Sequence, residues 1–258
     1  MTIPFSLVCL PFAGGGASFY RPWKKLDVAG VRVAPLQLPG REESFSEEPF
    51  TGVLDAARYL AAAVVKLADR QGPVALFGHS LGAVLAYETA RALEGDDRVD
   101  LLHLFVSGSP APGSGRSRRA SGLDDDEFLA RVEEFAGYRH HALDDPSMRE
   151  LLLPLLRVDV AMHEDYEPVS TRPLDVPVTS LRGTDDTLVL PDDAARWAAT
   201  TNAPFRAVEI PGGHMYLADS PRQLLELTVR SVRSVRSVRS VPLVRSTPSV
   251  RSVASGRG

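Results

Sequence analysis

Cysteine is nearly absent from this sequence of 258 residues. The only one, Cys9, lies in an apolar segment and cannot form a disulfide within the chain, so the fold must be stable through packing alone. No run of about 18 apolar residues occurs, and the first residues do not combine a basic segment with a long apolar one. We therefore expect a cytoplasmic protein that does not associate with membranes.

Basic charge is also scarce over most of the chain. The formal net charge is −4, but seven arginines and no acidic residue follow Glu226. Residues 1–226 therefore hold 22 lysines and arginines against 33 acidic residues, a net charge of −11. Such an acidic body argues against nucleic-acid binding, which requires a basic face to neutralise phosphates. The glycine motifs that bind nucleotide phosphates, G-x-x-x-x-G-K-[ST] and G-x-G-x-x-G, are missing as well.

Short apolar segments rich in valine, leucine and phenylalanine alternate with helical patterns. The short segments lack a strict apolar-polar alternation, which is typical of strands covered on both faces. Helical patterns occupy residues 51–69 and 81–93. This order predicts an α/β fold with a mostly parallel central sheet flanked by helices. The predicted strands are residues 6–12, 31–38, 74–78, 101–107, 176–182 and 205–210.

Residues 111–168 interrupt this alternation with a Gly/Ser/Arg-rich loop and then helical patterns alone. Asp124 and Glu127 resemble a capping box at the start of the first of these helices, and Pro154 is expected to break or kink a later one. The segment is too long for an ordinary crossover between strands. We therefore predict that it forms a helical lid over one edge of the sheet.

The C-terminal residues 230–258 contain a repeat of arginine, serine and valine. A three-residue period matches neither a helix nor a two-sided strand, and closely spaced like charges disfavour packing. We expect the helix that begins at Pro221 to fray into a disordered tail, which is either a dispensable extension or a basic arm for an acidic partner. The predicted α/β core then consists of residues 1–110 and 169–229.

The strongest chemical signal is a G-x-S-x-G motif centred on Ser80, between a predicted strand and a predicted helix. Its glycines permit a tight turn that exposes the serine hydroxyl at the end of the strand, and the helix directs its N-terminus at the same point. This context predicts an α/β-hydrolase fold with Ser80 as the nucleophile. The alternative is a turn of small residues needed only for packing.

A serine hydroxyl needs a general base, and six histidines are candidates. His214 follows the last predicted strand in a Pro-Gly-Gly-His loop, and this position suits the base. His79 adjoins the serine, but we expect its side chain to leave the turn in another direction, and His103 lies inside a predicted strand. The remaining three belong to the predicted lid: His140, His141 and His163.

The base needs a carboxylate, and Asp185 and Asp186 both come directly after the strand at 176–182. Either one gives the chain order serine, aspartate, histidine that this fold requires, and composition alone does not choose between them. Asp159 and Asp165 in the predicted lid are weaker candidates, which we expect to form ion pairs on helix surfaces.

Attack on a carbonyl also requires hydrogen-bond donors for the oxyanion. One predicted donor is the backbone N–H of Leu81, the residue after the nucleophile. The second is expected in the glycine-rich loop after the first strand, where we choose the N–H of Ala13.

With these residues assigned, the chain resembles the type II thioesterases that accompany polyketide and nonribosomal peptide synthases. The resemblance covers roughly residues 4–226. It favours Asp186 as the acid, through the family's G-x-x-D pattern after the strand, whereas Phe12 stands where histidine or tyrosine is common. The segments that carry it are LPFAGGGASFYRPW (10–23), QLPGRE (37–42), FGHSLGA (77–83), LLLPLLRVDVAMHEDY (151–166) and GGHMYL (212–217).

The resemblance implies that the protein hydrolyses acyl groups from the phosphopantetheine arm of acyl or peptidyl carrier proteins, through an acyl-serine. It implies no metal and no bound cofactor, because the pantetheine arm belongs to the partner. We further expect a monomer. Two alternatives stay open: a stand-alone carboxylesterase or lipase with the same three side chains, and a hydrolase-fold binding protein without catalytic activity.

Overall fold

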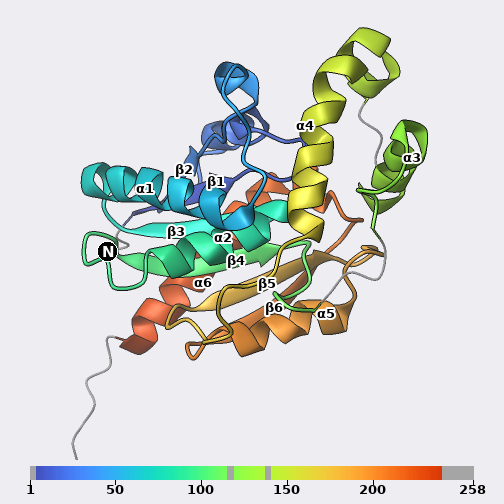
Figure 1. The fold of residues 1–258 in the computed structure, drawn as a ribbon. Helices are drawn as coiled ribbons and strands as arrows, with labels where there is room; N and C mark the ends of the chain where they lie inside the picture. The colour runs from blue at the N-terminus through green and yellow to red at the C-terminus, as the bar shows by residue number, and fades with distance from the viewer. Residues whose placement is uncertain (1–3, 115–118, 137–140, 240–258) are drawn as a thin grey trace, which may run out of the picture.

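The computed structural model describes residues 4–114, 119–136 and 141–239. Its centre is a six-stranded sheet in the order β2-β1-β3-β4-β5-β6, and every neighbouring pair of strands is parallel (Figure 1). All six predicted strands are present, with small shifts at their ends. They are β1 (Phe5–Leu10), β2 (Val31–Pro35), β3 (Val74–His79), β4 (Leu101–Ser107), β5 (Val178–Gly183) and β6 (Phe205–Ile210).

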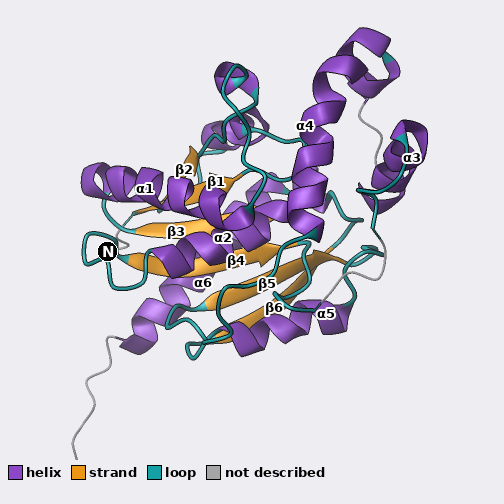
Figure 2. Ribbon diagram, viewed as in Figure 1, coloured by secondary structure: helices purple, strands orange, loops and turns teal. Residues whose placement is uncertain are grey.

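Helices cover both faces of the sheet (Figure 2). One face packs against α1 (Val53–Gln71) and α2 (Leu81–Ala92), and the other against α6 (Pro221–Arg239) and the 3-10 helix η1 (Ala17–Lys25). The inner strands are consequently buried almost throughout, whereas β2 and β6 at the edges are partly exposed. The shorter helices are η2 (Glu42–Ser44), η3 (His141–Asp144), α5 (Pro191–Ala195), η4 (Arg196–Thr200) and η5 (Tyr216–Ala218).

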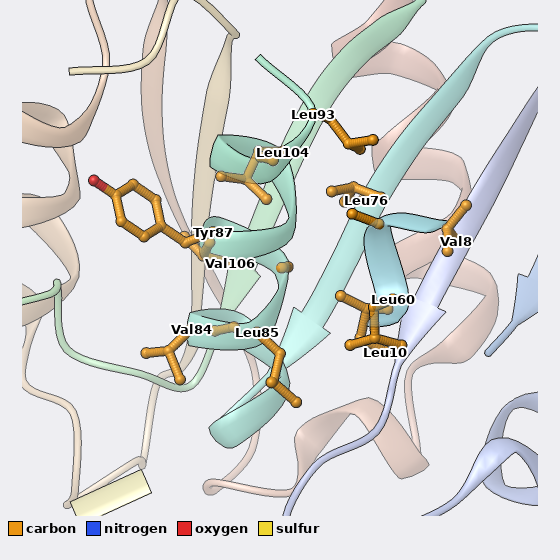
Figure 3. Close-up of a cluster of buried hydrophobic side chains, with 14 of the residues drawn as sticks. Val8, Leu10, Leu60, Leu76, Val84, Leu85, Tyr87, Leu93, Leu104 and Val106 are labelled. Carbon is orange, nitrogen blue, oxygen red and sulfur yellow. The ribbon is translucent and has the colours of Figure 1, made fainter. Parts of the chain in front are cut away.

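Successive side chains of a strand enter opposite layers of the core, because a strand alternates its side chains between the two faces. Leu76 of β3 packs toward Leu60 of α1 and Leu85 of α2 (Figure 3). Its neighbour Phe77 points to the other face and meets Trp23 of η1, with ring centroids 5.8 Å apart. Burial of each large apolar side chain contributes about 1.5–3 kcal/mol, so the two layers together fix β3 at the centre of the molecule.

The segment 111–168, called the insertion below, lies between β4 and β5 and contains α3 (Asp125–Ala136) and α4 (Pro146–Glu164). Asp124 caps α3 as expected, because its Oδ1 accepts the N–H groups of Asp126 and Glu127. We predicted a break or a kink at Pro154, and the break is absent, since α4 continues through this residue as one helix. Figure 1 shows both helices at the end of the sheet toward which the strand arrows point.

The C-terminal helix continues further than the sequence predicts. We expected a tail from residue 230, but α6 extends to Arg239 and buries Ser231 and Val232. A three-residue spacing drifts by only about 60° per repeat around a helix of 3.6 residues per turn, so a few repeats keep their valines on one face. Residues 240–258 lie outside the described part of the chain. None of the described helices has the length and apolar character needed to cross a membrane.

Candidate active site

The predicted site residues gather at one edge of the sheet. Because all six strands are parallel, the loops that follow their carboxyl ends meet at the same edge. Ser80 follows β3, Asp186 follows β5 and His214 follows β6. Ser80 and His214 line one cavity, and Asp186 contacts His214 directly. Three residues that are far apart in the sequence therefore lie at one edge of the sheet, and the printed contact among their side chains joins His214 to Asp186 at 2.9 Å.

Ser80 occupies a strained turn between β3 and α2. Its φ of 53° and ψ of −119° fall where L-residues are rarely found, and its N–H donates to the carbonyl of Ser107 at 2.8 Å. The motif glycines are required by close packing: a Cβ on Gly78 would lie 1.7 Å from the carbonyl oxygen of Gly82, and one on Gly82 would lie 2.8 Å from that of Pro11. The turn therefore lifts the half-buried serine out of the strand.

His214 and Asp186 form a buried pair. His214 Nδ1 lies 2.9 Å from Asp186 Oδ2, and the other carboxylate oxygen accepts the N–H groups of Leu188 and Val189 at 2.9 and 3.2 Å. A carboxylate only accepts hydrogen bonds, so we assign the imidazole proton to Nδ1, which leaves Nε2 as an acceptor. This geometry selects Asp186 over Asp185, whose side chain is exposed.

The two weaker acid candidates have other partners. Asp165 is exposed and pairs with Arg119, as expected for a surface ion pair. The same expectation for Asp159 is wrong, because this side chain is fully buried and forms a two-pronged ion pair with Arg41. Neither aspartate contacts His214, whose carboxylate partner is Asp186.

The loop after β1 forms a tight turn beside Ser80. The Gly15 N–H donates to the Phe12 carbonyl at 2.9 Å, and Gly14 has a φ of 70°, as a type II turn requires at its third position. The Gly14 N–H donates to Asp159 Oδ2 at 2.8 Å. Within the described residues, the Ala13 N–H has no protein partner. Leu81 is the first residue of α2, so its N–H precedes the hydrogen bonds of the helix.

A second imidazole lies against His214. We expected the His79 side chain to leave the turn in another direction, yet its ring centroid is 4.7 Å from that of His214. His79 Nδ1 lies 2.8 Å from Ser107 Oγ, which in turn lies 2.6 Å from the hydroxyl of Tyr216. Burial lowers the pKa of His79 well below its usual value, and the neighbouring His214 lowers it further. His79 is therefore uncharged near pH 7 and forms part of the cavity wall.

Gly108 belongs to the site although sequence reasoning missed it. It directly follows β4 with a φ of 55°. A Cβ at this position would lie 2.4 Å from Cε1 of His79 and 3.1 Å from Cε1 of His214. The sequence signal that could have identified Gly108 is a glycine immediately after β4, the strand that pairs with β3.

The cavity in front of Ser80 has a volume of about 440 Å³, and the wall opposite the core loops is mostly apolar, with Asp126, Glu133 and Arg149 as its charged members. The insertion supplies this wall from α3 and α4, while Phe12 and Met215 contribute from the core loops. Such a space suits an apolar chain attached to a carbonyl at the serine. No group of three or more potential metal-ligating side chains comes together in the described residues. The apolar wall residues include Leu129, Val132, Phe135, Leu152, Leu155 and Leu156.

A parallel sheet with a serine on a strained strand-to-helix turn, and a buried Asp–His pair at the same edge, defines the α/β-hydrolase class. Within that class the chain belongs to the thioesterase family, because the family model described as a thioesterase domain matches residues 5–231. It is thus a hydrolase that acts on thioesters.

Individual relatives agree with this assignment. The gramicidin S biosynthesis protein GrsT of Aneurinibacillus migulanus is 31% identical over 228 residues, which cover 88% of either chain. The thioesterase PikA5 of Streptomyces venezuelae is 37% identical over 213 residues, covering 83% of this chain and 75% of that one. The solved structure of RedJ, a thioesterase from the prodiginine biosynthetic pathway in Streptomyces coelicolor, matches with a TM-score of 0.80 and 32% identity over 88% of this chain and 90% of its own.

Proposed function

We propose that this protein is a type II, editing thioesterase that removes acyl groups from the phosphopantetheine arm of acyl or peptidyl carrier proteins. The observation that carries the proposal is the cavity in which Ser80 and His214 face an apolar wall built by the insertion. GrsT is named for gramicidin S biosynthesis and RedJ for the prodiginine biosynthetic pathway, which supports a biosynthetic setting here. The comparisons do not favour a general carboxylesterase or lipase.

In the proposed first half-reaction, Ser80 Oγ attacks the thioester carbonyl while its proton passes to His214 Nε2. A C–O bond forms, and the C–S bond breaks as the thiolate leaves and takes the proton from the imidazolium. Asp186 holds the His214 tautomer and stabilises the imidazolium. The N–H groups of Ala13 and Leu81 stabilise the oxyanion, each worth about 2.7–4 kcal/mol of the barrier.

The second half-reaction repeats these roles with water. His214 removes a proton from a water molecule that attacks the acyl-serine, and the same proton is returned to Ser80 as the free acid leaves. The chemistry requires no metal or bound cofactor in this proposal, because the pantetheine arm arrives with the carrier protein. The insertion then serves as a lid over the acyl chain, and the protein acts as a cytoplasmic monomer.

The experiment compares wild type with Ser80→Ala on acyl-carrier-protein thioesters and on acyl-pantetheine. We expect the variant to lose at least about 10³-fold in kcat, as other serine hydrolases do without the nucleophile. Ser109→Ala is the control, since this buried serine hydrogen-bonds the Pro110 carbonyl and does not line the main cavity. Equal turnover by wild type and Ser80→Ala would contradict the mechanism. Hydrolysis of simple esters with thioesters spared would contradict the proposed substrate.

A further inference from the structure

An ion pair buried beneath the insertion contacts the proposed oxyanion loop. Arg41 Nη1 donates to Asp159 Oδ2 and Arg41 Nη2 donates to Asp159 Oδ1, each at 2.9 Å. Arg41 is 5% exposed and Asp159 is fully buried. Asp159 lies on α4, and Arg41 follows the Pro-Gly turn after β2, so the pair joins the insertion to the core.

Both members of this pair also bind the backbone of the glycine loop. Asp159 Oδ2 accepts the N–H of Gly14 at 2.8 Å, and Arg41 Nη1 donates to the carbonyl of Gly15 at 3.0 Å. From the same helix, Leu156 packs so closely on Gly14 that a Cβ there would lie 2.9 Å from its Cδ1. The loop is therefore held at two consecutive residues, immediately after Ala13.

A run of three glycines needs such external support. Glycine loses more conformational freedom than other residues when it is ordered, and it has no side chain with which to anchor itself. An oxyanion donor is effective only when it is already aimed at the developing charge. Fixing Gly14 and Gly15 limits the orientations that the preceding N–H can adopt.

The charges of the pair are as important as its geometry. A lone carboxylate one residue from an oxyanion donor would repel the negative charge that develops in the transition state. Burial raises the pKa of Asp159, while the Arg41 guanidinium and the Gly14 N–H oppose that rise. The two-pronged contact with Arg41 cancels the carboxylate charge and leaves its oxygen free to accept from Gly14.

We propose that Asp159 and Arg41 are positioning residues for the oxyanion hole, so that helix α4 of the insertion contributes to catalysis as well as covering the cavity. The inference rests on the proposed role of the Ala13 N–H. It predicts that loss of the pair weakens transition-state binding more than substrate binding. The neutral carbonyl of the substrate forms weaker hydrogen bonds with the oxyanion hole than the charged oxygen of the transition state does.

The experiment measures kcat and KM for Asp159→Ala and Arg41→Met. It also measures the affinity of each variant for an alkylboronic acid, which forms a tetrahedral serine adduct, and for an unreactive thioether analogue of the substrate. We expect kcat to fall about 10- to 100-fold, less than for deletion of a donor, with the boronate affinity falling in parallel. KM and thioether binding should change by less than about threefold, since they report ground-state binding.

Two further variants separate positioning from simple stability. Arg41→Met combined with Asp159→Leu removes both buried charges, so we expect it to fold stably but to remain slow, because Gly14 still lacks its acceptor. Glu164→Gln is the matched control: Glu164 is a second buried carboxylate of α4, and it accepts the N–H groups of Ala120 and Ser121, away from the glycine loop. Its ratio of boronate to thioether affinity should equal that of wild type.

The result that would overturn the inference is a wild-type kcat in Asp159→Ala or in the double variant. An equal loss of boronate and thioether affinity would also overturn it, because the pair would then serve stability alone. Either outcome is distinct from failure of the proposed function, which would appear as an active Ser80→Ala enzyme.

Discussion

Gly108 leaves the space in which the imidazoles of His79 and His214 lie against each other, because it has no side chain. Alanine at this position would bring a Cβ within 2.4 Å of His79 and 3.1 Å of His214, so at least one ring must move. A displacement of about 1 Å in a catalytic group can cost 10²-fold in rate. We therefore expect Gly108→Ala to lower kcat about 100-fold, measured on acyl-pantetheine at saturating substrate.

Gly95→Ala is the matched control for this prediction. Gly95 also has a positive φ, 80°, but a Cβ there would meet nothing within 4 Å. Both substitutions should cost about 1–2 kcal/mol of stability from the left-handed backbone, and only Gly108→Ala should lose activity. Similar kcat values in the two variants would contradict the role given to Gly108.

At this scale the sequence identifies residues that carry their own local signal. The position of Ser80 on a turn could be predicted because its motif lies between a strand and a helix, and the position of His214 at the same edge because its loop follows the last strand. The contact between Arg41 and Asp159 could not, because the two are 118 positions apart and a lone aspartate on a helical pattern usually faces solvent. The position of the His79 ring likewise depends on the packing of β4 and Tyr216 beside it.

At the scale of single elements, α6 tests how a three-residue repeat folds. Val232 is 4% exposed and packs with the core layer behind the sheet, whereas Arg230 lies on the outer surface near Glu226. We expect Val232→Ala to lower the free energy of unfolding by about 2 kcal/mol, from lost burial and the cavity left behind. Arg230→Ala should change it by less than about 0.5 kcal/mol, because exposed ion pairs contribute little.

Urea unfolding of wild type and the two variants measures this difference. Equal, small effects for Val232→Ala and Arg230→Ala would mean that the helix does not dock through the repeat. The sequence could not give this extension of α6, because the repeat has no helical period of its own, and Val229 and Val232 are buried only through packing on the apolar surface behind the sheet.

Strands and long helices were more predictable, since their patterns span many residues. Strands β1, β3 and β4 are mostly apolar along their length because both of their faces are covered. The break expected at Pro154 fails for a physical reason: the flanking leucines Leu153 and Leu156 are buried in one cluster, which holds α4 together across the proline.

At the scale of the whole molecule, the sheet buries two histidines that remain neutral. Burial lowers the pKa of His103 to about 3, and the pKa of His79 is also well below its usual value for the same reason. Below pH 6.5 the unfolded chain binds protons at these positions and the native state does not. Stability is therefore lost as the pH falls through 6.5. The buried carboxyls of Glu88 and Asp159 have raised pKa values and act in the opposite sense, because the native state then holds the extra protons.

A single substitution isolates one term of this balance. His103→Gln removes the contribution of His103, which does not line the cavity and whose Nε2 lies 2.8 Å from Thr179 Oγ1, and it leaves the carboxyls in place. At pH 5.5, one unit below the pKa of an unfolded histidine, protonation of one such group in the unfolded chain lowers the stability of the native state by about 1.4 kcal/mol relative to pH 7.5. The stability advantage of wild type over His103→Gln, measured by urea unfolding, should accordingly shrink by about that amount between pH 7.5 and 5.5. An advantage that stays constant would mean that His103 takes up a proton in the folded protein, although its burial against the stacked ring of Phe105 disfavours the charged imidazole.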